Sequence, residues 1–137
     1  MKVRLRIMQA GIVLLALQAS AQTLPPQTAN AMCRTPSSTG DGAVFQCASE
    51  VDQLTAPAGF AFAQATLKGG IVGSGGPKPV CEVEWSQFVA VPADSASTQP
   101  RILTLRARAN SQRGYGRRGA GWANCSYTVQ LVPYAAP

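Results

Sequence analysis

The sequence predicts an all-β protein, a small disulfide-stapled antiparallel β-sandwich, and three features support this prediction. Three segments alternate apolar and polar residues with the two-residue period of a half-buried strand. They are residues 80–91, 101–110 and 122–132. The chain has four cysteines, an even number typical of a small exported domain with two disulfides. Stretches rich in glycine, proline and serine separate the segments and favour turns.

The first 21 residues have the composition of a secretory signal peptide. Three basic residues among the first six precede a short apolar run at 7–17, and small residues at 19–21 form a cleavage site. The apolar run is too short for a transmembrane helix. We therefore expect residues 1–21 to be removed on export to the periplasm or the extracellular space, and the mature chain to lack an integral membrane segment.

Removal of that segment leaves 116 residues, residues 22–137, which is one domain by length. The mature chain keeps nine basic and six acidic residues, a net charge of +3. All six acids lie before position 95, whereas six arginines fall between Arg101 and Arg118. We expect a polar N-terminal tail and turn at 22–42, followed by a single sandwich domain at 43–137.

The segment 80–91 has the clearest strand pattern. Most of its apolar residues, Cys81 and Trp85 among them, share one parity, and its two acids, Glu82 and Glu84, share the other. We expect a central strand with Trp85 facing the core.

The charges of this segment suggest how it pairs with 101–110. In an antiparallel register whose position numbers sum to 190, Trp85 lies opposite Leu105. Each facing pair of opposite charges adds roughly 0.2–1 kcal/mol to stability. The same register forms two such pairs, Glu84 with Arg106 and Glu82 with Arg108.

The first half of the chain has weaker patterns. Residues 43–51 predict a strand, and residues 60–67 predict a strand or a helix because phenylalanines alternate with alanines there. Residues 69–79 are rich in glycine and proline and predict a loop around a short strand at 71–72. These glycines lack the strand–loop–helix context of a phosphate-binding loop.

Four cysteines allow three disulfide connectivities, and we predict Cys33–Cys47 with Cys81–Cys125. If the three alternating segments formed a flat meander, the Cα atoms of Cys81 and Cys125 would be about 9–10 Å apart. A disulfide allows only about 7 Å. If Cys81 and Cys125 are bonded, then either their bond joins two sheets or the middle segment does not lie between the other two.

Candidate catalytic groups are few. The chain contains no histidine, which excludes histidine-dependent triads and metal sites. Glu82 and Glu84 are the best pair of carboxylates, but facing arginines would keep both ionised, which is wrong for the general acid of a glycosidase. A zinc site would need closely spaced cysteine pairs. We expect no enzymatic activity, no cofactor and no metal.

The remaining candidate site is the connection 111–121, with the sequence SQRGYGRRGAG. Arg113, Arg117 and Arg118 surround Tyr115 among glycines. An intracellular segment of this kind is typical of RNA binding, but the signal peptide argues against a nucleic-acid partner. Arginine binds sulfate, phosphate and carboxylate groups bidentately. We therefore expect an anionic glycan, a lipid head group or an acidic protein surface as partner, the alternative being a solvated loop whose charges only maintain solubility.

These features predict a secreted or periplasmic, non-catalytic binding or accessory module that acts through residues 113–118. The alternative is a structural subunit of a cell-surface assembly, a pilin-like sandwich, which the alternating C-terminal segment also suits. The sequence leaves the oligomeric state open. Sedimentation at several concentrations separates the two hypotheses, because an assembly subunit polymerises.

Overall fold

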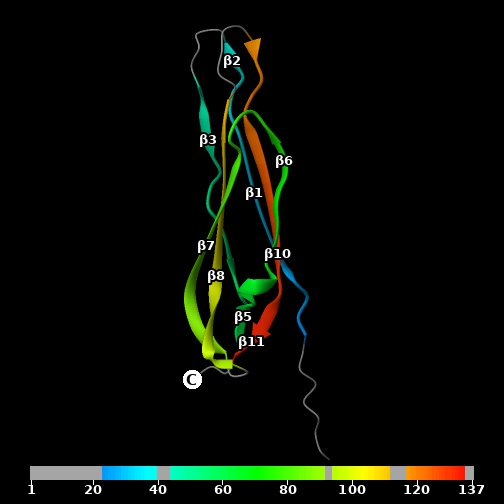
Figure 1. Ribbon diagram of the computed structural model, residues 1–137, viewed down its shortest axis with the longest axis vertical. Coiled ribbons are helices and arrows are strands. Elements are labelled where there is room, and N and C mark those ends of the chain that lie inside the picture. Colours follow the sequence, from blue (N-terminus) through cyan, green and yellow to red (C-terminus); the bar gives the residue numbers. More distant parts are fainter. Residues whose placement is uncertain (1–22, 40–43, 92–93, 112–116, 135–137) are drawn as a thin grey trace, which may run out of the picture.

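The computed structural model describes residues 23–39, 44–91, 94–111 and 117–134, which form strands and one short 3-10 helix, η1 (Figure 1). The elements in chain order are β1 (Gln27–Arg34), β2 (Ser38–Thr39), β3 (Gln46–Ala48), β4 (Asp52–Thr55), β5 (Phe60–Phe62), η1 (Gln64–Thr66), β6 (Lys68–Gly75), β7 (Val80–Val91), β8 (Asp94–Asn110), β9 (Arg117–Arg118), β10 (Trp122–Val129) and β11 (Leu131–Pro133).

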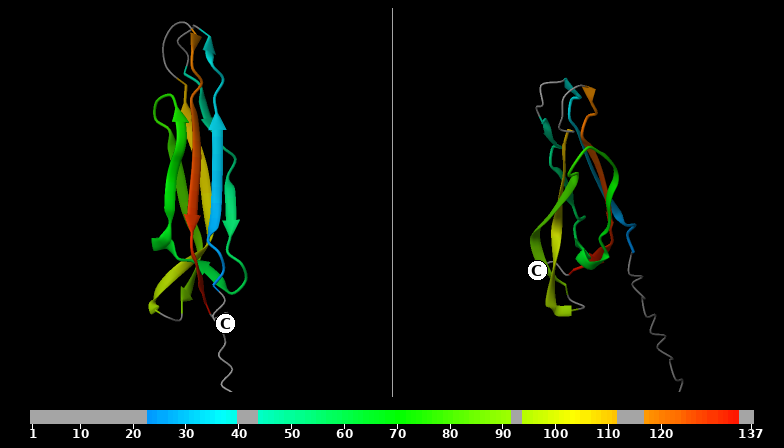
Figure 2. Two further views of the ribbon diagram at one scale, coloured as in Figure 1. Left: turned by 90° about the vertical axis from the view of Figure 1, so that its right-hand side faces the viewer. Right: turned by 45° about the horizontal axis from the view of Figure 1, so that its top comes forward.

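Two antiparallel sheets pack face to face, as the sequence predicted. In the first sheet, β10 lies between β1 and β6, an order that is clear in the left view of Figure 2. In the second, β8 has β7 along one side and β3 and β4 along the other. Two short ribbons, β2–β9 and β5–β11, lie at opposite ends of the sandwich (Figure 1).

The central strand of the second sheet is β8, and the prediction that residues 80–91 would be central is wrong. β8 is 17 residues long, enough to pair with three other strands, whereas β7 pairs only with β8 among the described residues. The predicted core face of β8 is confirmed, because its alternate residues from Leu103 to Ala109 are at most 1% exposed. Trp85 lies on an edge strand and is half-buried, with its ring 6.0 Å from that of Phe62.

The register of β7 and β8 differs by two residues from the predicted one. Trp85 lies opposite Leu103, and Glu82 lies opposite Arg106. A shift of two residues leaves every side chain on its predicted face, so the burial pattern could not distinguish the two registers. Glu82 still pairs with Arg108, but diagonally, with 2.8 Å between Oε1 and Nε.

Two strands form where other structure was expected. Gln27–Arg34, expected within a polar tail at 22–42, is β1, and its alternate residues Ala29, Ala31 and Cys33 are buried against the second sheet. Lys68–Gly75, expected mainly as a loop, is β6. Small side chains on both strands gave a weak apolar signal, although the two-residue alternation of burial on β1 is regular.

The weaker expectations for residues 43–67 hold in part. Of the described residues 44–51 of the segment 43–51, only Gln46–Ala48 form a strand, and Phe45 and Val51 on either side are exposed. The segment 60–67 divides into β5 and η1, so it contains both a strand and a short helix.

Both predicted disulfides are confirmed, and each joins the two sheets. Cys33 of β1 bonds to Cys47 of β3, with 5.8 Å between their Cα atoms. Cys81 of β7 bonds to Cys125 of β10, with 5.9 Å between theirs. These bonds indicate an oxidising environment, of the kind found outside the cytoplasm.

Candidate functional site

The described parts of the predicted arginine connection, Ser111 and residues 117–121, lie at one end of the sandwich beside the described parts of a second connection, residues 35–39 and 44–45. We call residues 35–45 together with 111–121 the tip. Arg117 and Arg118 form β9, whose backbone pairs antiparallel with β2 (Figure 1). Arg113 and Tyr115, the other two predicted site residues, lie outside the described residues. In sequence, the tip contains three arginines and one acid, Asp41.

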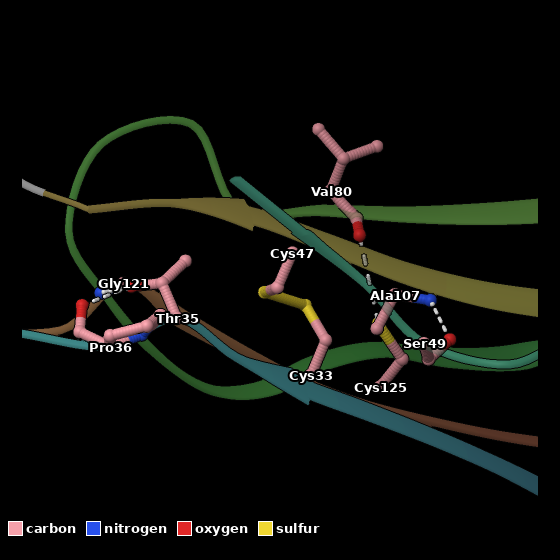
Figure 3. Close-up of a disulfide and its surroundings, with 9 residues drawn as sticks. All are labelled: Cys33, Thr35, Pro36, Cys47, Ser49, Val80, Ala107, Gly121 and Cys125. Carbon is pink, nitrogen blue, oxygen red and sulfur yellow. Dashed lines mark hydrogen bonds between the residues drawn. A yellow bond between two sulfur atoms is a disulfide. The ribbon is translucent and has the colours of Figure 1, made fainter. Parts of the chain in front are cut away.

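The first attachment of the two connections is made by Thr35 and Gly121. The Thr35 amide donates to the Gly121 carbonyl at 2.7 Å, and the Gly121 amide donates to Thr35 Oγ1 at 2.8 Å. The Thr35 hydroxyl donates in turn to the Pro36 carbonyl, as Figure 3 shows. Thr35 is 3% exposed, so these bonds satisfy polar groups that water cannot reach.

The second attachment has the same form and joins the other ends of the two connections. The Ser111 amide donates to the Phe45 carbonyl at 2.8 Å, and the Phe45 amide donates to Ser111 Oγ at 2.9 Å. Ser111 is fully buried. Each connection is therefore bonded to its neighbour at both of its ends, through one buried hydroxyl on each connection.

The Cys33–Cys47 disulfide lies beside the Thr35–Gly121 hydrogen bonds (Figure 3). It links β1 and β3, the strands on either side of residues 35–45. The backbone of Gly121 packs closely against the backbone at Asn110 and Ser111. Glycine allows this contact, because a Cβ on residue 121 would lie 2.7 Å from the Ser111 amide nitrogen. The tip thus rests on a covalently linked base. Sequence reasoning found the disulfide and the arginines but not Thr35 or Ser111, since single buried hydroxyls leave no periodic signal.

The carboxylates considered for catalysis lie on the outer face of the second sheet. Glu82, Glu84 and two arginines of β8 line a shallow hollow of about 140 Å³ with Val51 and Thr104. Glu82 is paired with Arg108, and both side chains are nearly half exposed. This is the open, charged outer face that the strand pattern predicted.

Two further hollows lie elsewhere. One of about 440 Å³ runs between β1 and residues 49–52. There Asp52 Oδ2 accepts a hydrogen bond from the backbone amide of Asn30 at 3.3 Å. The other, about 260 Å³, lies at the β5–β11 end and is lined largely by apolar residues, Phe60 and Leu131 among them. Within the described residues, no group of three potential metal ligands occurs and no helix is long and apolar enough to span a membrane.

None of the protein-family models, curated proteins or solved structures compared with this chain matches it.

Proposed function

We propose that this protein is an exported, non-catalytic binding module that holds anionic groups of its partner at the tip. The observation that carries the proposal is the double attachment of the two connections. Buried hydroxyls of Thr35 and Ser111 fix both ends of the arginine connection, and β9 pairs with β2 between them. Holding the ends of a connection in place lowers the entropic cost of binding, because fewer conformations are lost when a partner is bound.

Charge composition supports the same proposal. The tip contains three arginines and a single acid, and guanidinium groups bind carboxylate, phosphate and sulfate in a bidentate manner. Anionic glycans, lipid head groups and acidic protein surfaces all present such groups. These partners share anionic groups, and binding to one probe of each kind distinguishes them.

Binding of the mature protein to three immobilised probes tests the proposal. The probes are heparin, vesicles containing phosphatidylglycerol, and polyglutamate. We expect at least one probe to retain the wild type and to lose it as ionic strength rises through about 0.15 M, because salt screens exposed charges. Changing Arg113, Arg117 and Arg118 together to Ser should abolish retention.

A matched variant controls for net charge. Changing Lys68, Arg106 and Arg108 to Ser removes the same number of positive charges from faces away from the tip, and it should leave retention in place. The proposal fails if both triple variants bind alike. Tyr115→Ala should weaken retention without changing its salt dependence, since the substitution removes a contact surface and no charge.

A structural subunit of a surface assembly is the second candidate, and strand β6 is the observation that favours it. β6 pairs only with β10 among the described residues, and its Ile71 and Val72 are 45% and 61% exposed. An unprotected edge strand can pair with another chain. In sedimentation, the size of the particles should increase with protein concentration. Val72→Lys should abolish this increase, whereas Met32→Lys, on the opposite edge of the same sheet, should leave it in place.

A further inference from the structure

Residues 23–26 precede β1 and lie against the end of the sandwich opposite the tip. Thr23 and Leu24 line the hollow of about 260 Å³ at that end, together with Phe60 of β5 and Leu131 of β11. Leu24 is half-buried, so this segment packs on the domain. The residue that precedes Thr23 in the chain is therefore within reach of the hollow.

The wall of this hollow is uncharged. Phe60, Leu131 and Pro133 contribute apolar side chains, and no Asp, Glu, Lys or Arg is among the described residues that line it. An ammonium group placed there would lose hydration without gaining a carboxylate partner, which is costly. The hollow therefore suits a neutral occupant.

Gln130 supplies a polar contact in the hollow. Its backbone amide and carbonyl are bonded to Thr66 and Ala63, but within the described residues its side-chain amide makes no hydrogen bond. A primary amide offers a carbonyl acceptor and N–H donors side by side. A matching group presents one N–H and one carbonyl in the same direction, as the cis amide of a lactam ring does.

The chain itself can supply such a ring. Gln22 precedes Thr23, and cleavage after Ala21 makes it the first residue of the mature chain. This step rests on the export that is part of the proposed function. A glutamine at a free amino terminus can form a lactam, because its α-amine reaches its own side-chain amide and closes a five-membered ring.

We propose that Gln22 is converted to pyroglutamate after cleavage and that the neutral ring occupies the hollow. The α-amine nitrogen attacks Cδ of the same residue and forms the N–Cδ bond. The Cδ–Nε2 bond breaks, and ammonia leaves with a proton from the amine. The step needs no oxidant or reductant, and a fraction of α-amino groups is neutral and able to attack at physiological pH.

Mass spectrometry of the protein purified from an exporting host tests the modification. We expect the mature chain to start at residue 22, with a mass about 17 Da below that of the unmodified chain, because one ammonia is lost. A chain that starts at Gln22 with a free amine, or at another internal residue, overturns this inference alone. A chain that still starts at Met1 contradicts both this inference and the proposed export.

Two substitutions assign the loss of ammonia to one residue. Gln22→Ser cannot form the ring and should show no loss. Gln27→Ser is the matched control, because Gln27 is close by in the sequence but its nitrogen lies in a peptide bond, and this variant should keep the loss. Retention of the loss in Gln22→Ser would overturn the assignment.

Nuclear Overhauser contacts test the place of the ring. The methylene protons of the modified residue 22 should contact the aromatic protons of Phe60. Gln130→Ala should weaken these contacts and leave the mass loss in place, whereas Gln53→Ala, a change of an exposed glutamine on β4, should affect neither. Absence of contacts between the ring and Phe60 in the wild type would overturn the placement in the hollow.

Discussion

At the scale of a single residue, the buried Thr35 bonds the two connections of the tip to each other. Its hydroxyl accepts a hydrogen bond from the Gly121 amide and donates one to the Pro36 carbonyl. An amide that loses its partner inside a protein bears the full cost of desolvation, about 1–3 kcal/mol. Thr35 therefore contributes to stability chiefly by satisfying the Gly121 amide.

We expect Thr35→Val to lower the free energy of unfolding by about 1–3 kcal/mol, because it keeps the side-chain shape but leaves the Gly121 amide unpaired. Thr28→Val on the same strand is the matched control. Thr28 is exposed, and the change there should stay within about 0.5 kcal/mol. Urea unfolding of the oxidised proteins measures both values, and equal midpoints for the two variants would contradict the expectation.

Phe62 and Trp85 have different importance in the core although their rings are in contact. Phe62 is fully buried on β5, whereas Trp85 is half-buried on an edge strand. We expect Phe62→Ala to lower the free energy of unfolding by about 3–5 kcal/mol, and Trp85→Ala to lower it by less, since part of its surface already contacts water. Denaturant unfolding of both variants checks the order, and a larger loss for Trp85→Ala would reverse the assignment.

The pairing of β7 and β8 shows what sets register at the scale of an element. Opposite charges did not select the predicted register, and the Glu82–Arg108 pair formed diagonally instead. Exposed ion pairs contribute only about 0–1 kcal/mol, less than the burial of the apolar residues on the other face. The apolar face therefore fixed the parity, but it could not distinguish between registers of equal parity.

Glu82→Gln should accordingly change the stability by less than about 1 kcal/mol, because both partners are nearly half exposed and solvent screens their attraction. A double-mutant cycle with Arg108→Gln measures the interaction itself. A coupling above about 1 kcal/mol would mean that the ion pair does help to hold the two strands in register.

The glycines of β6 are needed for the tryptophan that covers them. A Cβ on Gly73 would meet the indole at 2.9 Å, so Gly73→Ala should displace the ring of Trp122. We expect stronger quenching of tryptophan fluorescence by iodide and a loss of stability. Gly119→Ala is the control, because a Cβ there meets no atom within 4 Å, and it should change neither quantity.

At the scale of the whole molecule, two disulfides link the two sheets and stabilise the folded state. Cys33–Cys47 spans a sequence separation of 14 residues and Cys81–Cys125 one of 44. The loss of chain entropy in the unfolded state gives about 3 and about 4 kcal/mol respectively. The longer loop therefore makes the larger contribution, and the shorter one holds the base of the tip.

Replacing Cys81 and Cys125 together with Ser should lower the free energy of unfolding by about 1 kcal/mol more than replacing Cys33 and Cys47, owing to the longer loop. The Cys33/Cys47 variant should instead raise amide hydrogen exchange at Gly121 and Ser111, whose bonds lie beside that disulfide. Exchange that rises equally across all strands would contradict this local effect.

The sequence alone determined the strand class and the faces of β7, β8 and β10, and it favoured, among three possible connectivities, the two disulfides that form. Each of these depends on short-range alternation, or on the count and spacing of cysteines in one chain. Only the tertiary structure decided that β8 is central, that β1 and β6 complete the first sheet, and that Thr35 and Ser111 bind the two connections of the tip to each other. Those facts depend on contacts between distant segments, and small or single residues such as Ala29, Gly73 and Ser111 become informative only once a partner lies against them.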